Sequence, residues 1–333
     1  MARIIALTGG SGFVGRRLIP RLAATGAQIR ILARTPEGLG KAVQGCVVVP
    51  GDLADEAALA QLVTGAGAVI HVAGAISAPD RAAFDRTNVA GTATLAKIAG
   101  QCGVSRFVHL SSMAAREPEL SDYAASKRAG ETALLDQVGE TSWTILRPPA
   151  VYGPGDKATL PLIMQLTRRH AFLPGAPNNR ASLIHVDDLA DALIALASGS
   201  EPNGTVHEID DGHHGGYSWH ELAQIAGRAQ GIDITVHHVP RPLLMAAAQG
   251  AALITKLTGK PAMLSPGKVR ELYHPDWVAR HDLLQKHSDW RAKVDFASGV
   301  EMTLDWYRRH QWLPVVASTA RNQNKTDQSE TTT

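Results

Sequence analysis

A tyrosine and a lysine lie four residues apart, at Tyr123 and Lys127, in a segment whose residue pattern favours a helix. That spacing puts both side chains on one helical face, about 6 Å apart. A phenol has a reference pKa near 10, and a neighbouring ammonium lowers this pKa because it stabilises the phenolate. The pair can therefore act as a general acid and its electrostatic partner, although most Tyr/Lys pairs at this spacing belong to a solvated helix face.

A serine at the end of a predicted strand supplies a third polar group. The run Arg106–Ser111 is apolar enough to form a buried strand, and Ser112 follows it directly. Ligands of open α/β sheets bind at the carboxyl ends of the strands, so we expect Ser112 to face Tyr123 in a cleft. The serine hydroxyl can orient a substrate carbonyl and donate a hydrogen bond to a developing alkoxide.

A glycine-rich turn occupies the first junction between a predicted strand and a predicted helix. It reads Thr8-Gly9-Gly10-Ser11-Gly12-Phe13-Val14-Gly15. The early glycines permit a tight turn and let the backbone approach a pyrophosphate, while Gly15 lets the helix pack close to the sheet. The helix N-terminus adds free N–H groups and partial positive charge. This position favours a dinucleotide site over a plain structural turn.

The residue after the second predicted strand favours NADP(H), with NAD the less favoured cofactor. An acidic residue about 20 residues past the glycines would bind the ribose of NAD, but Arg34 follows the strand Gln28–Ala33. A guanidinium can hold a 2′-phosphate through charge-assisted hydrogen bonds. Alternatively, Arg34 only stacks on adenine, which would tolerate NAD. Asp52, after the strand Val47–Pro50, is placed to accept from the adenine amino group or to cap the next helix.

Strands and helices must alternate to position these groups, and the first half of the chain shows that alternation. The predicted strands are Arg3–Thr8, Gln28–Ala33, Val47–Pro50, Val69–Ala73, Arg106–Ser111 and Ser142–Leu146. The predicted helices are Gly15–Ala24, Glu56–Val63, Arg81–Ala99 and Asp122–Leu135. Alternation with strands that are apolar throughout predicts an α/β fold of Rossmann type, a doubly wound parallel sheet with helices on both faces.

The pattern becomes irregular after Pro148, which predicts a smaller, mostly helical C-terminal substrate domain. We assign residues 1–150 to a dinucleotide-binding domain, 151–180 and 211–315 to the substrate domain, and 316–333 to a disordered tail. Strands near 181–210, at Ser182–Val186 and Gly204–Ile209, are expected to join the main sheet. Three C-terminal helices are predicted. The first begins at a Ser218/Glu221 capping box and runs through Ala229, and the other two are Pro242–Gly259 and Ser298–His310.

Composition excludes several classes of protein. The 333 residues are 44% hydrophobic with a formal net charge of +2, which excludes a disordered chain and gives no electrostatic case for nucleic acid. Two cysteines, Cys46 and Cys102, cannot build a disulfide framework, and they fit a reducing, cytoplasmic location. The adjacent histidines His213-His214 and His237-His238 lack the spacing of ligand pairs, so we predict no metal site.

These motifs together resemble those of the extended short-chain dehydrogenase/reductase family, which includes NAD-dependent epimerases and dehydratases. The matching segments, spread over residues 1–313, are Thr8–Gly15, Gly51–Leu53, His71–Ala75, Asn88–Thr92, Leu110–Ser112, Tyr123–Lys127, Arg147–Pro154, His185–Ala190 and Gly299–Tyr307. The resemblance implies that Tyr123 is the acid/base, with Lys127 and Ser112 as its partners. It also implies a homodimer. The further cofactor contacts that it implies are Leu53, Ala73, Gly74, Pro148 and Val151.

Three departures argue against a nucleotide-sugar enzyme. Ala150 stands where such members of the family carry an asparagine that holds a substrate phosphate, and Arg180 is one residue out of step with their Arg-Asp pair. Arg34 suits NADP, whereas epimerases retain NAD. We therefore expect reduction of a ketone on a hydrophobic substrate, either a 3-oxo-sphingoid or ceramide-type lipid or a steroid-like molecule. The alternatives are a nucleotide-sugar epimerase or dehydratase, and a non-catalytic nucleotide-binding subunit of a membrane complex. The second alternative rests on the resemblance of this chain to the accessory subunits of complex I.

One apolar segment stands out in the second half. Leu243–Thr255 is apolar except for Gln249, with Arg241 and Lys256 beside its ends. Its expected role is a buried helix or a cap over the substrate pocket. The alternative is peripheral membrane contact through Leu243–Leu257, at the inner membrane, since the segment is too short to span a bilayer.

Overall fold

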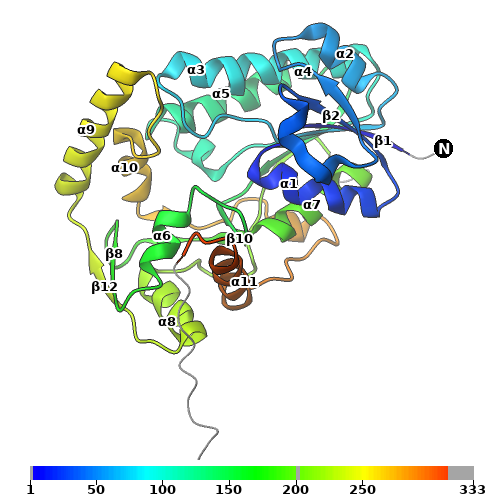
Figure 1. The fold of residues 1–333 in the computed structure, drawn as a ribbon. Helices are drawn as coiled ribbons and strands as arrows, with labels where there is room; N and C mark the ends of the chain where they lie inside the picture. Colours follow the sequence, from blue (N-terminus) through cyan, green and yellow to red (C-terminus); the bar gives the residue numbers. More distant parts are fainter. Residues whose placement is uncertain (1–2, 200–202, 314–333) are drawn as a thin grey trace, which may run out of the picture.

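Within residues 3–199 and 203–313, which this computed structural model describes, the chain forms one seven-stranded sheet (Figure 1). The strand order is β11 (Thr205–Glu208), β6 (Ser142–Arg147), β5 (Arg106–Leu110), β4 (Ala68–His71), β1 (Ile4–Thr8), β2 (Gln28–Ala33) and β3 (Val47–Pro50). Every neighbouring pair is parallel. Because the chain runs outward in both directions from β1, the sheet is doubly wound, as the alternation predicted.

Helices cover both faces of this sheet. Helices α1 (Phe13–Ala24) and α7 (Val186–Ser198) pack together on one face, and α2 (Glu56–Val63), α4 (Gly91–Gln101) and α5 (Asp122–Gln137) cover the other (Figure 1). Each face has its own buried apolar cluster. Apolar side chains on both sides of β1 and β4 therefore remove water from the centre of the sheet, and polar groups are left at the strand ends.

The two strands expected near 181–210 have different fates. Strand β11 joins the main sheet beside β6, but β10 (Leu183–His185) pairs with β7 (Ala150–Tyr152) in a separate two-stranded sheet. The expectation that both would join the main sheet was wrong for β10. Its physical reason is that β11 occupies the outer edge of β6, and a strand edge pairs with only one neighbour.

The single helix predicted over Arg81–Ala99 is interrupted. Helix α3 (Arg81–Asp85) passes into a π-helical turn, η2 (Arg86–Ala90), before α4 begins. Such a turn inserts an extra residue into the helix and often accompanies a functional residue. Here it places the amide side chain of Asn88 in a buried position between β4 and α5.

A third apolar cluster forms the core of the smaller, mostly helical part of the chain. Its elements are α6 (Leu160–Gln165), β8 (His170–Leu173), α8 (Trp219–Gln230), β12 (Thr235–His238) and α11 (Phe296–Arg309). The predicted capping box is present, because Ser218 accepts from the Glu221 N–H and Glu221 accepts from the Ser218 N–H. Helix α11 presses on β7, where a Cβ at Gly299 would lie 2.2 Å from the Tyr152 hydroxyl oxygen.

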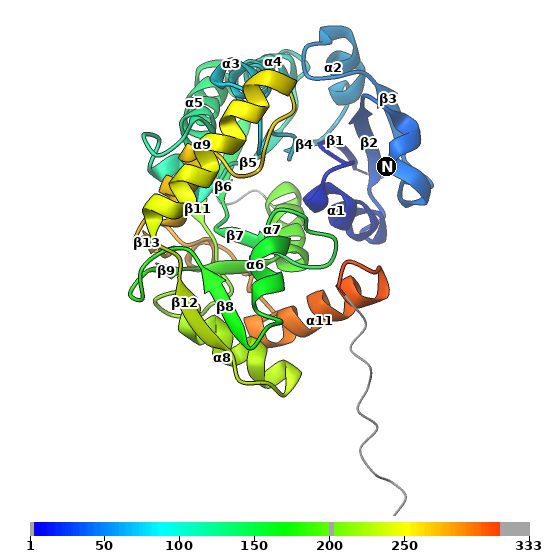
Figure 2. The same cartoon turned by 60° about the vertical axis from the view of Figure 1, so that its left-hand side comes forward.

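Helix α9 (Arg241–Thr258) packs on α10 (Pro266–Leu272) at one side of the molecule (Figure 2). Shorter elements complete the described chain: η1 (Pro36–Val43), η3 (Met113–Arg116), β9 (Arg180–Ala181), β13 (Asp276–Trp277) and η4 (Leu284–Lys286). In the described ranges, none of the helices is both long enough and apolar enough to cross a membrane. The predicted tail, 316–333, lies outside the described residues.

Candidate active site

The glycine-rich turn after β1 leaves no space for side chains. Gly9 has a φ of +75°, and a Cβ there would lie 2.6 Å from the Ala73 nitrogen. A Cβ at Gly15 would lie 2.2 Å from the Gly9 carbonyl oxygen, so this glycine permits the turn itself to close rather than only letting the helix approach the sheet. Gly12 caps α1 without a side-chain hydrogen bond. Backbone N–H groups are therefore exposed to an anion, and the turn fits a dinucleotide pyrophosphate.

A chain of hydrogen bonds ties this turn to β4. The Thr92 hydroxyl donates to the Asn88 carbonyl, so it accepts from Nε2 of His71 at 3.0 Å. Nδ1 of His71 then accepts from the Thr8 hydroxyl at 2.7 Å, and Thr8 accepts from the Ala73 N–H. Burial lowers the pKa of His71 to about 3, which keeps the ring neutral and consistent with this tautomer.

Asn88 joins the end of β4 to helix α5. Its side chain accepts from the Ala75 N–H at 2.8 Å and donates both to the Ala75 carbonyl and to the Ser126 hydroxyl. A Cβ at Gly74 would lie 3.3 Å from the Asn88 amide oxygen and 3.6 Å from Nζ of Lys127. The predicted cofactor residue Gly74 therefore lies beside Lys127, the predicted partner of Tyr123. The sequence analysis missed this role of Asn88, because only the buried π-helical turn reveals it.

Tyr123 is half-buried in the first turn of α5, which the Ser121 side chain caps by accepting from the Ala124 N–H. Burial raises the pKa of Tyr123 to about 12, a hydrogen bond with the Ser112 side chain lowers it, and the carboxylate of Glu271 raises it. The sequence predicted an acidified phenol. The structure differs, because desolvation by burial is the largest effect on this phenol and outweighs the hydrogen bond with Ser112.

Lys127 is buried and donates from Nζ to the Leu110 carbonyl at 2.7 Å. Burial lowers the pKa of this lysine to about 8, while the carboxylate of Glu131 raises it. Helix α5 thus brings Tyr123 and Lys127 to one buried side, as their spacing predicted. The Lys127 amine is held at the end of β5, next to Ser112.

Glu131 supports this lysine through a network that the sequence analysis did not identify. Its carboxylate accepts from the Ser111 hydroxyl at 2.5 Å and from both Nε and Nη2 of Arg147, at 2.8 and 2.5 Å. Burial lowers the pKa of Arg147, but the hydrogen bonds and negative charge of Glu131 raise this pKa above its ordinary value. A usable signal was present, since Glu131 follows Lys127 by one helical turn, the same spacing that links Tyr123 to Lys127.

Ser112 lies at the carboxyl end of β5, as expected. It caps η3, because its hydroxyl oxygen accepts from the Ala114 N–H at 3.1 Å. The next residue, Met113, donates its N–H to the Pro148 carbonyl at 2.9 Å, which brings the segment after β6 beside the serine. Val151 follows in β7, where it is half-buried. Ser112 and Pro148 are therefore neighbours, consistent with one shared site.

Arg34 and Asp52 lie on adjacent turns, which follow the carboxyl ends of β2 and β3. The Gly51 N–H donates to the Ala33 carbonyl, which joins the turns after β2 and β3. Arg34 is exposed and forms no hydrogen bond or ion pair with the described residues. The Asp52 carboxylate accepts from the nearby Ala54 N–H, and the Asp52 carbonyl accepts from the Asp55 N–H.

The helix that follows this turn settles one alternative. Asp55 caps α2 by accepting from the Ala58 N–H at 3.0 Å. The alternative that Asp52 is the helix cap is therefore wrong, and its contact with adenine stays a prediction. Leu53 packs against α4, where a Cβ at Gly91 would lie 2.8 Å from the Leu53 side chain.

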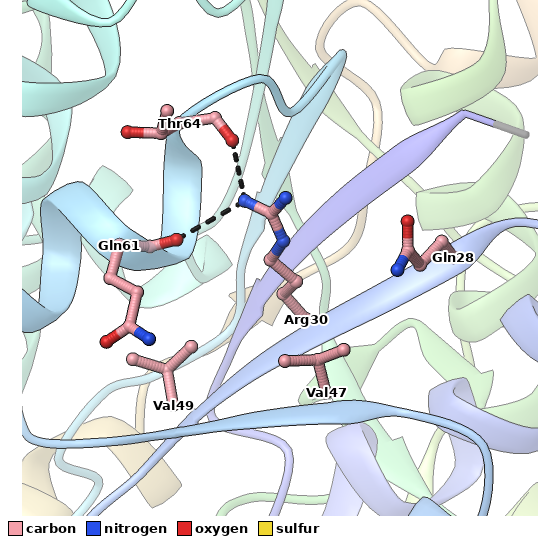
Figure 3. A pocket seen from close by; sticks show the side chains of 6 residues that line it. All are labelled: Gln28, Arg30, Val47, Val49, Gln61 and Thr64. Carbon is pink, nitrogen blue, oxygen red and sulfur yellow. Dashed lines mark hydrogen bonds between the residues drawn. The ribbon is translucent and has the colours of Figure 1, made fainter. Parts of the chain in front are cut away.

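A separate hollow of about 510 Å³ lies on the outer part of the sheet (Figure 3). Alternate residues of β2 and β3 line it together with the end of α2: Gln28, Arg30, Val47, Val49, Gln61 and Thr64. The Arg30 guanidinium donates to the Thr64 carbonyl at 2.6 Å, so its charge is engaged by the protein. Because this hollow is lined by the amino-terminal part of β2 and the first residues of β3 rather than by the carboxyl ends of the strands, it is not the dinucleotide site.

The histidine-rich loop does not form a ligand cluster. His213 stacks on Tyr217 with ring centroids 3.9 Å apart, and the Tyr217 hydroxyl donates to Asp211. In the part of the chain that the structure describes, no group of three histidine, cysteine or acidic side chains is arranged to hold a metal ion.

Comparison with known proteins identifies the family. The model of the NAD dependent epimerase/dehydratase family matches residues 5–209. The chain belongs to this family. It is 38% identical over 316 residues to a ceramide reductase of Caulobacter vibrioides, covering 93% of this chain and 96% of the relative. It is also 29% identical to a farnesyl-dihydroquinoline-oxide ketoreductase of Stigmatella aurantiaca, over 73% of this chain and 78% of that protein.

Solved structures share the fold. MoeE5 in complex with UDP-glucuronic acid and NAD is similar with a TM-score of 0.70 and 23% sequence identity, over 93% of this chain and 100% of MoeE5. These comparisons confirm the predicted family, the Rossmann-type α/β fold and an NAD(P)-dependent oxidoreductase.

Proposed function

We propose that this enzyme uses NADPH to reduce a ketone on a hydrophobic, lipid-like substrate. The observation that carries the proposal is the grouping of Ser112, Tyr123 and Lys127 at the end of β5, beside the residues that close the glycine turn. A relative that is 38% identical and covers 93% of this chain is named a ceramide reductase, and a second relative is a ketoreductase of a farnesylated ring. A 3-oxo-sphingoid or ceramide-type ketone is therefore the substrate class that we favour.

Each side chain has a role that its environment supports. With a pKa of about 12, Tyr123 is protonated at neutral pH and donates its proton to the carbonyl oxygen of the substrate. The Ser112 hydroxyl orients that oxygen, and Lys127 stabilises the phenolate that forms. Bound reduced nicotinamide supplies the hydride to the carbonyl carbon. A reducing direction suits a raised tyrosine pKa, because the enzyme then starts from the proton donor rather than from the phenolate.

Substrate trials test this function directly. The purified protein is mixed with NADPH and a 3-oxo-sphingoid or ceramide-type ketone, and both NADPH loss at 340 nm and the alcohol product are measured. Ketone-dependent oxidation with alcohol formation supports the proposal. Conversion of UDP-sugars without such reduction would favour the epimerase alternative, which Ala150 argues against because its side chain cannot hydrogen-bond to a substrate phosphate. Cofactor binding without turnover of either class would favour the non-catalytic alternative.

Arg34 supports NADPH over NADH in this proposal, since it is exposed and has no partner in the described chain that would compete for a phosphate. We expect Arg34→Ala to raise KM for NADPH by about tenfold or more, with little change in kcat or in KM for NADH. Arg30→Ala is a matched control, because Arg30 donates to the backbone near the end of α2. Equal loss with both cofactors would instead assign Arg34 to adenine stacking.

A further inference from the structure

Helix α9 presents an apolar face to solvent. Leu243, Leu253, Ile254 and Leu257 on this face are 65%, 59%, 61% and 78% exposed. The small residues Ala246, Ala247 and Gly250 are exposed between them. Successive members of this set are three or four residues apart or adjacent, the pattern that places them on one side of a helix. We call this set the outward face of α9.

The opposite side of α9 packs against the protein. Ala248 and Thr255 are buried, and Leu244, Met245 and Ala251 are half-buried, while α9 contacts α10. The expectation of a buried helix therefore holds for this inward side alone. Apolar residues on both sides indicate that a second apolar medium covers the outward face, because an exposed helix face is otherwise polar.

Charge around α9 indicates what that medium is. Between Asp233 and Glu271 the sequence contains no acidic residue. Arg241, Lys256 and Lys260 stand near the two ends of the helix and form no ion pair within the described residues. An apolar helix face bordered by free cations is typical of helices that lie in the surface of an anionic bilayer. A second copy of the chain fits less well, since a two-fold contact through this face would bring like charges together.

Helix α10 connects this face to the candidate active site. A Cβ at Gly267 of α10 would lie 2.7 Å from the Ser121 side chain, and the Ser121 hydroxyl donates to Glu271. The Arg270 guanidinium donates to the Leu120 carbonyl at 2.6 Å. These contacts fix α10 on the turn that starts α5 and carries Tyr123, and α9 lies outside α10 at the same side of the molecule (Figure 1).

We infer that the outward face of α9 docks this enzyme on an anionic lipid surface. Docking places the start of α5 near the bilayer, from which a lipid ketone can be taken without crossing water as a free molecule. This second step rests on the proposed function, whereas docking itself rests on the helix face and its charges. The flanking cations attract the headgroups, and the exposed leucines enter the apolar boundary beneath them.

Sedimentation of the full chain with vesicles tests the docking. The protein is mixed with vesicles of phosphatidylcholine alone or of phosphatidylcholine with phosphatidylglycerol, and the bound fraction is measured. We expect binding to the anionic vesicles, which high salt weakens. Replacing Leu253→Asp and Leu257→Asp together lowers the affinity by at least about tenfold, because charges must then enter the apolar boundary. Met302→Asp is the control, since Met302 is an exposed apolar residue of α11.

The outcomes separate docking from catalysis. Wild-type protein that does not bind anionic vesicles, or a double variant that binds as well as wild type, overturns the inference. A double variant that becomes monomeric from a wild-type dimer, with no vesicle binding by either, also overturns it and assigns the face to a second copy. Vesicle binding without reduction of any ketone contradicts the proposed function and leaves docking intact. If both hold, the double variant reduces a short, water-soluble ketone at the wild-type rate and a vesicle-borne ketone more slowly.

Discussion

Lys127 illustrates how strongly the surroundings of one residue decide its chemistry. Burial lowers the pKa of its ammonium to about 8, and the carboxylate of Glu131 opposes that shift. Above this pKa the lysine becomes neutral and no longer stabilises a phenolate on Tyr123. We therefore expect the reduction rate to fall as pH rises through about 8, well below the ordinary pKa of a lysine near 10.4.

The variant Glu131→Gln tests this role of Lys127 through the direction in which its pH–rate profile shifts. Because the carboxylate raises the pKa of Lys127, its removal moves the alkaline fall in kcat to lower pH. The measurement is a pH–rate profile of both proteins with saturating cofactor and ketone. Arg128→Gln is the control, since the Arg128 guanidinium is exposed and comes no nearer than 3.7 Å to the Glu131 carboxylate. Loss of such a weak, solvated ion pair should leave the pH of the alkaline fall in kcat almost unchanged. A purely structural Glu131 would lower the rate without moving the profile.

At the scale of elements, the turn between β1 and α1 is the most constrained part of the site. A methyl group at Gly15 would overlap the Gly9 carbonyl oxygen, and that atom belongs to backbone that cannot rotate away. We expect Gly15→Ala to weaken NADPH binding by tenfold or more and to lower the free energy of unfolding by about 1–3 kcal/mol. Titration of intrinsic fluorescence with NADPH and thermal unfolding measure the two effects.

Gly38→Ala provides the comparison for that turn. Gly38 lies in η1 after β2, and a Cβ there would meet no atom within 4 Å. This variant should bind NADPH and unfold as wild type does. If Gly15→Ala also behaves as wild type, the turn is wider than described and the account of the pyrophosphate site is wrong.

The elements also show how far the sequence predicts the molecule. Apolar strands and amphipathic helices in regular alternation predicted the sheet, because local patterns decide which faces are buried. The pairing of β10 with β7 depends on which strand occupies the edge of β6, and the local sequence pattern of a strand does not determine its partner. The π-helical turn at Asn88 was likewise missed, since the Asn88 side chain is held by hydrogen bonds with Ala75 and Ser126, which lie 13 and 38 residues away in the sequence.

Residue roles followed the same division. Tyr123 and Lys127 were placed correctly by their spacing, which fixes geometry within one helix. The direction in which the pKa of Tyr123 shifts was not predicted correctly, because the shift depends on burial and on Glu271 of α10, which is distant in the sequence. Glu271 and Arg147 entered the site only once the tertiary structure was known.

The whole molecule combines a nucleotide-binding sheet with a smaller part, and α9 and α10 lie together at one side of the molecule (Figure 1). Helices α1 and α7, on one face of that sheet, are joined by an ion pair as well as by packing, because Asp187 of α7 accepts two hydrogen bonds from Arg17 of α1, at 2.7 and 2.6 Å. These bonds lower the pKa of Asp187 against its burial. If α9 docks on a bilayer as proposed, its packing on α10 and the contact of α10 with Ser121 bring the start of α5 and Tyr123 toward a membrane-borne ketone.

The central claim is that the phenol of Tyr123 gives its proton to the substrate while NADPH is bound beside it. Replacement of Tyr123 by phenylalanine, Tyr123→Phe, removes one oxygen and leaves the ring that packs near Phe84. Single-turnover formation of the alcohol, followed together with NADPH binding by fluorescence, measures both events in one protein. We expect alcohol formation to fall at least about a hundredfold while the Kd for NADPH stays within about twofold of wild type. Alcohol formation at the wild-type rate in this variant would contradict the account.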